Sequence, residues 1–216
     1  HGRLNVCLGP GAIPTDNEVY GIKPEEVGPR IVESIDMIMK IWTSDPPYDL
    51  RGTFWNVCLS EHIDEEFGLG TLHKPLQQPH PPIFVPSITP SKGLQAAAAR
   101  GFRPISHHML HPDVLSAQWT AYREGAESGG REAVPRDWCI SRNVFVADST
   151  DEARKLARNN SLGNCIQYIC DLTQRIAPQG LGLWKPSPEM TDDECNLDYF
   201  MDEVVIAGDP ERVTEQ

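Results

Sequence analysis

Three histidines lie close together near the middle of the chain. His107 and His108 follow a short apolar stretch, and His111 lies three residues further on. Histidine can act as an acid or a base near neutral pH and is a common metal ligand. Consecutive residues at a strand end point in opposite directions, and no Asp or Glu of recognisable ligand spacing accompanies the three. We therefore expect acid–base chemistry here and no metal ion, with a metal-dependent hydrolase as the alternative.

A group of hydroxyl residues follows another apolar stretch. Ser87, Thr89 and Ser91 come after the apolar residues 83–85, directly before a predicted Ala-rich helix. Hydroxyls and free N–H groups at a helix N-terminus form an anion-binding site, to which Lys92 adds a positive charge. The alternative is that these side chains only cap the helix.

Small residues mark a turn near the start of the chain. Gly9 and Gly11 flank Pro10 after the predicted strand 3–8, and residues of this size let a flat ring lie close to the backbone. An ordinary Gly-Pro turn is the alternative. Asn5 is polar within that otherwise apolar strand, so it needs a partner from a cofactor or a neighbouring strand.

A basic residue lies early in the last of four predicted strands. Arg142 there is a candidate site residue, although a buried arginine must be paired, so a structural salt bridge is the alternative. The acidic runs 61–66 and 192–194 are expected to be solvated loops.

The elements that position these residues alternate along the chain. The predicted strands cover residues 3–8, 83–85, 102–106 and 138–147. The predicted helices cover residues 27–42, 94–100, 112–128 and 152–159, the last with its N-cap at 149–151. Strand, loop and helix in repeated order predict an α/β fold with a parallel sheet and crossover helices. An open sheet and a closed barrel both fit this pattern.

The remaining segments are less regular. We expect a polar loop at 14–24, a hairpin at 50–59 with Gly52 at its turn, and an irregular stretch at 161–199. Residues 204–207 precede a last helix that begins at 208–210.

Composition narrows the class of protein. The 216 residues carry 19 Lys and Arg against 31 Asp and Glu, a net charge of −12, which argues against a nucleic-acid partner. No apolar run reaches the roughly 18 residues of a membrane helix. Six cysteines without a C-x-x-C spacing favour reduced, mostly buried thiols in a cytoplasmic protein. The chain begins at His1 rather than Met, and we expect it to be part of a longer one.

Residues His1–Gly21 (HGRLNVCLGPGAIPTDNEVYG) resemble the G-R-x-N-x-G-x-G stretch and the acidic-aromatic-Gly element of the bacterial luciferase-like flavin monooxygenases. Further stretches agree in order and spacing: Glu33–Trp42, Arg51-Gly52 with Phe54, Lys74–Val85 (KPLQQPHPPIFV), Arg142–Arg154 (RNVFVADSTDEAR) and Val205–Val213 (VIAGDPERV). The limonene-monooxygenase-like and alkanesulfonate-monooxygenase-like members are most similar.

The resemblance implies a TIM-like (β/α)8 barrel, of which this chain would supply roughly strands four to seven. Residues 1–216 would form one partial barrel domain, with repeats over 1–160, a variable insertion at 161–201 and the lead-in to the last strand at 202–216. Relatives are commonly homodimers.

The resemblance also implies an activity. Reduced FMN from a separate flavin reductase would react with O2 to a C4a-peroxyflavin, which oxygenates a small organic substrate. The alternatives are an F420-dependent oxidoreductase of the same fold, the metal-dependent hydrolase, and a catalytically silent flavin-binding barrel.

The resemblance also implies roles for individual residues of the site. Asn5, Gly9, Gly11, Ser87, Thr89 and Ser91 would bind the cofactor. The family binds the flavin phosphate at the loop after residue 85, where Thr89 matches the hydroxyl position best. His107, His108 and Arg142 would face flavin or substrate as catalytic residues. Pro10 stands where luciferases carry a phosphate-binding basic residue, which is a departure from the family pattern.

Overall fold

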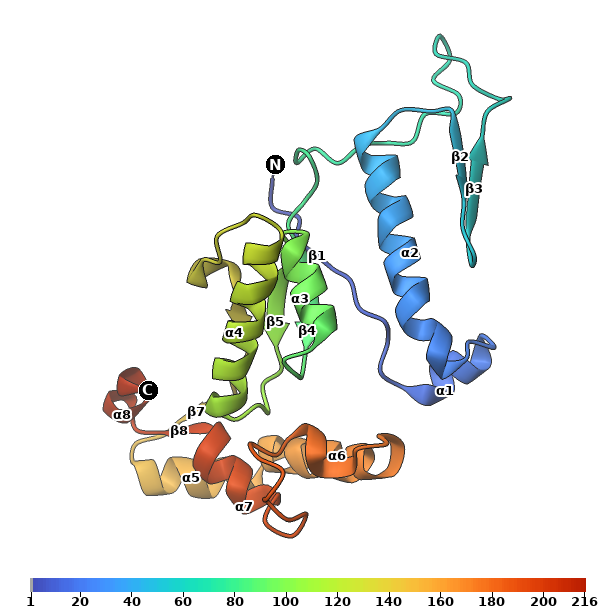
Figure 1. The fold of residues 1–216 in the computed structure, drawn as a ribbon. Helices are drawn as coiled ribbons and strands as arrows, with labels where there is room; N and C mark the ends of the chain where they lie inside the picture. Colours follow the sequence, from blue (N-terminus) through green and yellow to red (C-terminus); the bar gives the residue numbers. More distant parts are fainter. Residues whose placement is uncertain (1) are drawn as a thin grey trace. The chain divides into compact units, whose positions relative to one another are not determined.

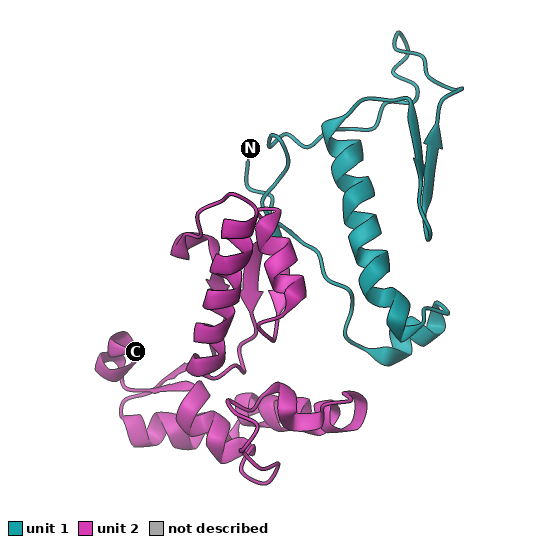
Figure 2. Cartoon of the chain, in the orientation of Figure 1, with its two compact units in different colours: residues 1–84 teal, residues 85–216 magenta. Residues whose placement is uncertain are grey.

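The chain divides into two compact units. A computed structural model describes residues 2–216, so that His1, the first residue of the family-like motif, lies outside the described residues. The first unit comprises residues 1–84 and the second residues 85–216, with the boundary inside one β-strand (Figure 2).

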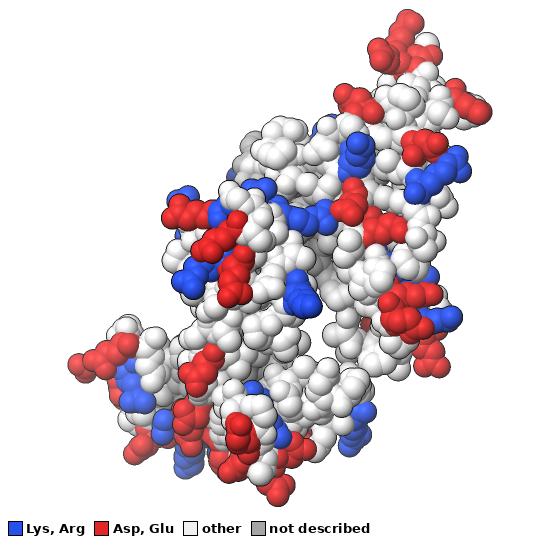
Figure 3. Space-filling view, in the orientation of Figure 1, with Lys and Arg blue, Asp and Glu red and all other residues white. Residues whose placement is uncertain are grey.

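The first unit holds one parallel strand pair and one hairpin. Strand β1 (Val6–Cys7) pairs in parallel with the beginning of β4 (Ile83–Ser87), in the register Val6↔Ile83. Strands β2 (Tyr48–Arg51) and β3 (Asn56–Leu59) form the hairpin expected at 50–59 (Figure 1). The acidic residues of the loop after β3 are exposed, as expected, and form a red group at one end of the view in Figure 3.

Helix α2 (Pro24–Thr43) confirms the long apolar-striped helix and extends it at both ends. Pro24 occupies the first turn, where its missing N–H removes no hydrogen bond. At the other end, the Lys74 ammonium donates to the carbonyl oxygens of Ile41 and Ser44 and to the Tyr48 hydroxyl. A cation at this place complements the negative end of the helix dipole.

A short helix replaces part of a predicted loop. Residues 14–24 were expected to be a polar loop, but α1 (Pro14–Val19) begins at Pro14. Its six residues are too few to show a helical period in the sequence, although a proline at the first position is a usual helix start.

The carboxylate of Glu33 on α2 fixes the hairpin turn. It accepts hydrogen bonds from the backbone N–H groups of Thr53, Phe54 and Trp55 at 2.8–2.9 Å. A Cβ atom at Gly52 would collide with this carboxylate, so a larger residue there would displace the Glu33 side chain.

The second unit continues the parallel sheet. The rest of β4, then β5 (Arg103–Ser106) and β6 (Cys139–Ile140), lie side by side in that order, and β5 pairs in parallel with β6. Helices α3 (Lys92–Ala99) and α4 (Pro112–Ser128) connect them, and α4 has its predicted bounds. The two helices approach so closely that a Cβ atom at Gly125 would strike Gln95.

The strand predicted at 138–147 is two strands. Strand β6 ends at Ile140, and β7 (Val144–Val146) instead pairs in parallel with β8 (Ile206–Gly208). Arg142 and Asn143 lie between these two strands. Arg142 donates to Leu110 O and Asn143 Nδ2 contacts His108 Nδ1, both in the segment that follows β5, and these contacts interrupt the extended run.

Helix α6 (Ser161–Ile176) is also a correction, because residues 161–199 were expected to be irregular. Asn160 caps it by accepting a hydrogen bond from Leu162 N. The remaining α-helices of this part are α5 (Thr150–Asn159), with Ser149 as its N-cap, α7 (Leu197–Tyr199) and α8 (Pro210–Glu215). A 3-10 helix covers Gly180–Leu183, and a π-helix covers Phe200–Val204.

The 161–199 segment also contributes to the core of the second unit. The buried residues Ile166, Leu181 and Trp184 pack in one cluster with Met109 and Phe200.

All six cysteines are free thiols, as expected. They are not mostly buried, however: Cys170 and Cys195 are buried, whereas Cys7, Cys58, Cys139 and Cys165 are exposed. Within residues 2–216, no helix combines the length and apolar character that crossing a bilayer requires.

Candidate functional site

The carboxyl ends of β4 and β5 meet in the second unit. The backbone N–H of His107 donates to the carbonyl oxygen of Ser87 at 3.3 Å. In parallel α/β folds the reactive groups lie on the loops that follow this end of the strands. The hydroxyl loop and the histidines therefore share one edge of the sheet.

A buried network of polar side chains connects the strands at this edge to α4. The Ser106 hydroxyl donates to Gln118 Oε1 at 2.6 Å and accepts from Trp138 Nε1 at 2.8 Å. Gln118 Nε2 in turn donates to the Ser87 hydroxyl at 3.1 Å. Ser106 and Gln118 are almost completely buried, so the network ties the ends of β4 and β5 to α4.

The three hydroxyls have different surroundings. Ser87 is buried, and its hydroxyl donates to Thr89 O. Ser91 is the N-cap of α3 and accepts from Leu94 N at 3.2 Å, which is the capping role weighed as the alternative. Thr89 is exposed, as is Lys92 in the first turn of the helix. A Cβ atom at Gly93 would meet only Ser91, so this helix end is open.

The rings of His107 and His108 lie side by side, contrary to the expectation that they diverge. Their centroids are 4.3 Å apart with 30° between the planes. Strand β5 ends at Ser106, so the two histidines belong to a turn, where strand alternation no longer applies. The ring of Trp184 adjoins His107, with 4.8 Å between centroids.

In both histidine rings, Nδ1 is the nitrogen that has a hydrogen-bond partner. His107 Nδ1 accepts from the backbone N–H of Met109 at 3.3 Å, and Asn143 Nδ2 lies 2.8 Å from His108 Nδ1. Burial, and then the neighbouring His108, lowers the pKa of His107 to about 4. Burial, and then the charge of Arg142, lowers the pKa of His108. Both rings are therefore favoured in their neutral form at pH 7.

His111 is not part of this pair. Its Nδ1 accepts from Asp113 N at 3.1 Å as the N-cap of α4, and its ring stacks on Tyr199 at 6.3 Å between centroids. In the described part of the chain, no group of three or more His, Cys, Asp and Glu side chains is arranged to hold a metal ion.

Arg142 donates to a backbone carbonyl rather than to an acid. One guanidinium nitrogen lies 2.5 Å from Leu110 O, and no carboxylate among residues 2–216 lies within 4 Å of the group. The structural salt bridge considered from the sequence is therefore not present in this region. Burial lowers the pKa of Arg142.

The glycine turn and Asn5 belong to the first unit. Asn5, Gly9 and Gly11 are exposed. Gly11 has φ +84°, a conformation that glycine adopts readily. A cavity of about 140 Å³ lies at the carboxyl end of β1, lined by Gly9, Pro10, Asn17, Ile22, Val27, Arg30, Ile31, Ser34 and Trp55.

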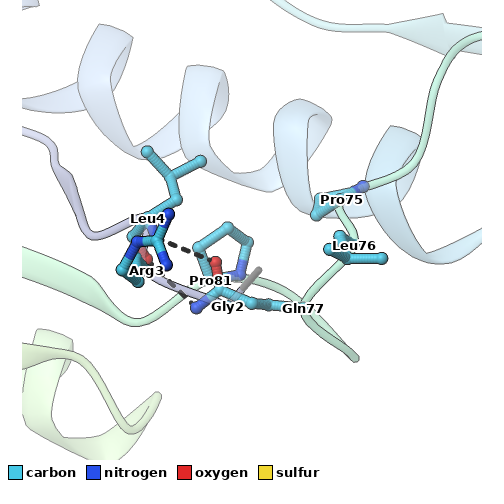
Figure 4. A pocket seen from close by; sticks show the side chains of 7 residues that line it. All are labelled: Gly2, Arg3, Leu4, Pro75, Leu76, Gln77 and Pro81. Atoms are coloured by element: carbon cyan, nitrogen blue, oxygen red, sulfur yellow. Dashed lines mark hydrogen bonds between the residues drawn. The ribbon is translucent and has the colours of Figure 1, made fainter.

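Another cavity, of about 260 Å³, lies before β1, at the opposite end of that strand (Figure 4). There the Gln77 side chain donates to Leu4 O at 3.1 Å and accepts from Leu4 N at 3.2 Å. This double hydrogen bond fixes the entry to the strand, and the amino end of such strands usually serves stability.

Sequence reasoning missed several residues of the site. Asn143 and Gln118 each lie within a predicted element, and neither was singled out as a candidate. Trp184 lies in the segment predicted to be irregular. The only signal for Asn143 was that it forms, with Arg142, a polar pair inside an otherwise apolar strand pattern.

Parallel strands joined by helices, with polar and aromatic groups at their carboxyl ends, define a class of α/β folds in which ligands bind at this edge. Within that class the family is identified: the model of the luciferase-like monooxygenases matches residues 1–216, and the chain belongs to this family.

Two monooxygenases are similar to the chain in sequence. The chain is 25% identical over 235 residues to 3,6-diketocamphane 1,6-monooxygenase of Pseudomonas putida, covering 100% of this chain and 61% of that protein. It is 25% identical over 162 residues to the oxygenase component of a flavin-dependent trigonelline monooxygenase of Acinetobacter baylyi, covering 73% of this chain and 41% of that protein.

A solved structure matches the fold. The oxygenating constituent of 3,6-diketocamphane monooxygenase from Pseudomonas putida, a type II Baeyer–Villiger monooxygenase in complex with FMN, superposes with a TM-score of 0.78. The identity is 25%, over 97% of this chain and 58% of that chain. The chain thus spans about three fifths of the length of these diketocamphane monooxygenases.

Proposed function

We propose that the protein is the oxygenase component of a flavin-dependent monooxygenase. It would use reduced FMN from a separate flavin reductase, and O2, to oxygenate a small organic substrate. The carrying observation is the adjacency of the open Thr89 loop and the His107–His108–Trp184 ring group at one strand edge.

The donor set of the β4–α3 loop fits a phosphate group. The Thr89 hydroxyl, the Lys92 ammonium and the N-terminus of α3 are all exposed there, and Gly93 keeps the helix end open. We propose Thr89 as the phosphate-binding side chain, with Ser87 and Ser91 shaping the loop through their own hydrogen bonds.

FMN supplies the redox chemistry of such a reaction when it is bound. The part of this chain is to position the reactants and exclude water. The two neutral histidines, which are half-buried, offer flat, weakly polar surfaces for this purpose, and the buried Trp184 packs beside His107. We propose that Arg142 contacts substrate or flavin. For the first unit, we propose Asn5, Gly9 and Gly11 as cofactor-binding residues, as the resemblance implies.

Two further proposals concern the protein as a whole. Free thiols, four of them exposed, fit a reducing cytoplasmic location. We also propose a homodimer, as the resemblance to the family implies, which light scattering of the purified protein would test.

Titration with oxidised and reduced FMN tests the function. We expect reduced FMN to bind, and Thr89→Ala to weaken it about tenfold, or about 1.4 kcal/mol, the loss of one charge-assisted hydrogen bond. Thr120→Ala, an exposed threonine on α4, is the matched control. Binding of F420 but not FMN would contradict the proposal, as would the absence of binding to either.

Turnover distinguishes an enzyme from a silent flavin-binding barrel. We expect oxygen consumption with a flavin reductase and NADH to increase when a substrate is added. Flavin binding without any substrate-dependent oxygen consumption, across a panel of ketones, aldehydes and terpenes, would favour the silent barrel.

A further inference from the structure

Arg142 is a half-buried cation whose partner within residues 2–216 is a carbonyl oxygen, Leu110 O, rather than a carboxylate. Burial lowers the pKa of Arg142, and the next largest influence on it is Tyr199. Burial raises the pKa of Tyr199 in turn, so this phenol is uncharged at pH 7 and does not neutralise the arginine. The positive charge of Arg142 is therefore not balanced by its neighbours in this region.

The guanidinium keeps one edge for a ligand. Its Nη1 atom donates to Leu110 O at 2.5 Å, whereas Nε and Nη2 have no partner within the described part of the chain. No buried side-chain nitrogen or oxygen of residues 2–216 lacks a hydrogen-bond partner, so both atoms must reach the surface of the second unit. Their two N–H bonds are parallel, and a carboxylate accepts such a pair with its two oxygens.

An anion gains more than an uncharged group at this place. The lowered pKa of Arg142 means that burial has removed part of the water that stabilises its charge. A charge in such surroundings costs free energy until it is paired. A carboxylate supplies the opposite charge and two acceptor oxygens, whereas a carboxamide of the same shape supplies one acceptor oxygen without charge.

Arg142 shares the strand edge of the Thr89 loop but is not adjacent to that loop. The residue before it, Ser141, donates its backbone N–H to Ser106 O at the end of β5, at 3.2 Å. Strand β5 lies between β4 and β6, so Arg142 is about two strand spacings, or about 10 Å, from the loop that follows β4. A phosphate bound at Thr89 therefore leaves Arg142 without a counter-charge.

We propose that Arg142 determines specificity by binding a carboxylate of the substrate through its Nε and Nη2 atoms, so that the protein prefers small organic acids to uncharged compounds of the same size. The inference rests on the proposed function in taking this anion to be the substrate, whereas its binding requires no flavin.

Two probes of equal shape give the first test. Cyclohexanecarboxylate and cyclohexanecarboxamide differ in charge, and calorimetry of the purified protein at pH 7 should show about tenfold tighter binding of the carboxylate, or about 1.4 kcal/mol. Arg142→Gln should abolish this preference. Arg142→Lys keeps the charge without the paired N–H groups and should retain part of it. Arg123→Gln, which removes an exposed arginine of α4, is the control and should leave both affinities unchanged.

The ring of His108 gives the second test, because it reports the charge of Arg142. Burial, and then the charge of Arg142, lowers the pKa of His108. A carboxylate that neutralises Arg142 should therefore raise the pKa of His108, measured from its ring signals in ¹H–¹³C spectra. The carboxamide should leave this pKa unchanged, and Arg142→Gln should raise it without any ligand.

The outcomes separate this inference from the proposed function. Equal affinities of the two probes, absence of carboxylate binding, or an unchanged pKa of His108 in the presence of the carboxylate would each overturn the carboxylate site. Near-ultraviolet circular dichroism checks that Arg142→Gln is folded. If it is not, Arg142→Lys and the two probes on the unmodified protein carry the test.

FMN titration of the same variants should give unchanged affinities. A loss of FMN affinity in Arg142→Gln as large as the loss of carboxylate affinity would assign Arg142 to the flavin and overturn the inference. Binding of the carboxylate by a protein that binds no FMN would contradict the proposed function alone.

Discussion

The amide of Asn143 lies 2.8 Å from Nδ1 of His108, across 35 residues of sequence. Asn143 stands in the gap between β6 and β7, and His108 in the turn after β5. The interruption of a strand thus supplies the group that fixes the orientation of a candidate site ring. Second-layer hydrogen bonds of this kind determine which nitrogen of a histidine faces a ligand.

Gln118→Leu should destabilise the second unit, because it removes one hydrogen-bond partner each from the hydroxyls of Ser87 and Ser106. We expect a loss of about 1–3 kcal/mol in the free energy of unfolding, measured by urea titration. Gln167→Leu on an exposed face of α6 is the control. Equal stability of Gln118→Leu and the unmodified protein would mean that the network contributes nothing.

Glu33→Leu should release the β2–β3 turn from α2. The amide protons of Thr53, Phe54 and Trp55 then lose their acceptor, and we expect their hydrogen exchange to accelerate about tenfold or more. Glu25→Leu, in the exposed first turn of the same helix, should leave these three protons unaffected. Unchanged exchange in Glu33→Leu would show that other contacts hold the turn.

His107 should make stability depend on pH. Its pKa of about 4 in the folded protein lies below the 6.5 of an unperturbed ring, so between these values the unfolded chain binds a proton that the folded protein does not. The free energy of unfolding is therefore not reduced by this ring above about pH 6.5. It decreases by about 3 kcal/mol as the pH falls from there towards 4.

Urea unfolding at several pH values measures this effect. His107→Gln should remove that part of the decrease between pH 7 and pH 4, while the carboxylates titrate alike in both proteins. Parallel stability curves for the two proteins would show that the His107 ring titrates normally.

Much of the fold could be predicted because local signals are strong in this chain. The bounds of α4 follow from Pro112 at its start and Gly129 at its end, and the apolar period predicts α2 but not its first and last residues. Errors arose where tertiary contacts override the local pattern. The stretch 138–147 is apolar and β-branched enough for one strand, yet its two halves pair with different strands.

The candidate site, like the fold, could be predicted only in part. Residue types alone placed a hydroxyl loop and a histidine pair after parallel strands, because chemistry-bearing loops follow the carboxyl ends of strands in such folds. Sequence spacing could not show that the two rings lie side by side, since this depends on where β5 ends and the turn begins.

The sequence by itself determined the alternation of strands and helices, the family, and the segments that carry the candidate site. These follow from periodicity, turn residues and motifs, which are local. Only the tertiary structure decided which hydroxyl is exposed, which ring nitrogen is hydrogen-bonded and that, within residues 2–216, Arg142 pairs with a carbonyl oxygen rather than an acid. Those properties depend on groups that are distant in sequence, such as Gln118 behind Ser87 and Asn143 behind His108, and on the burial that folding imposes.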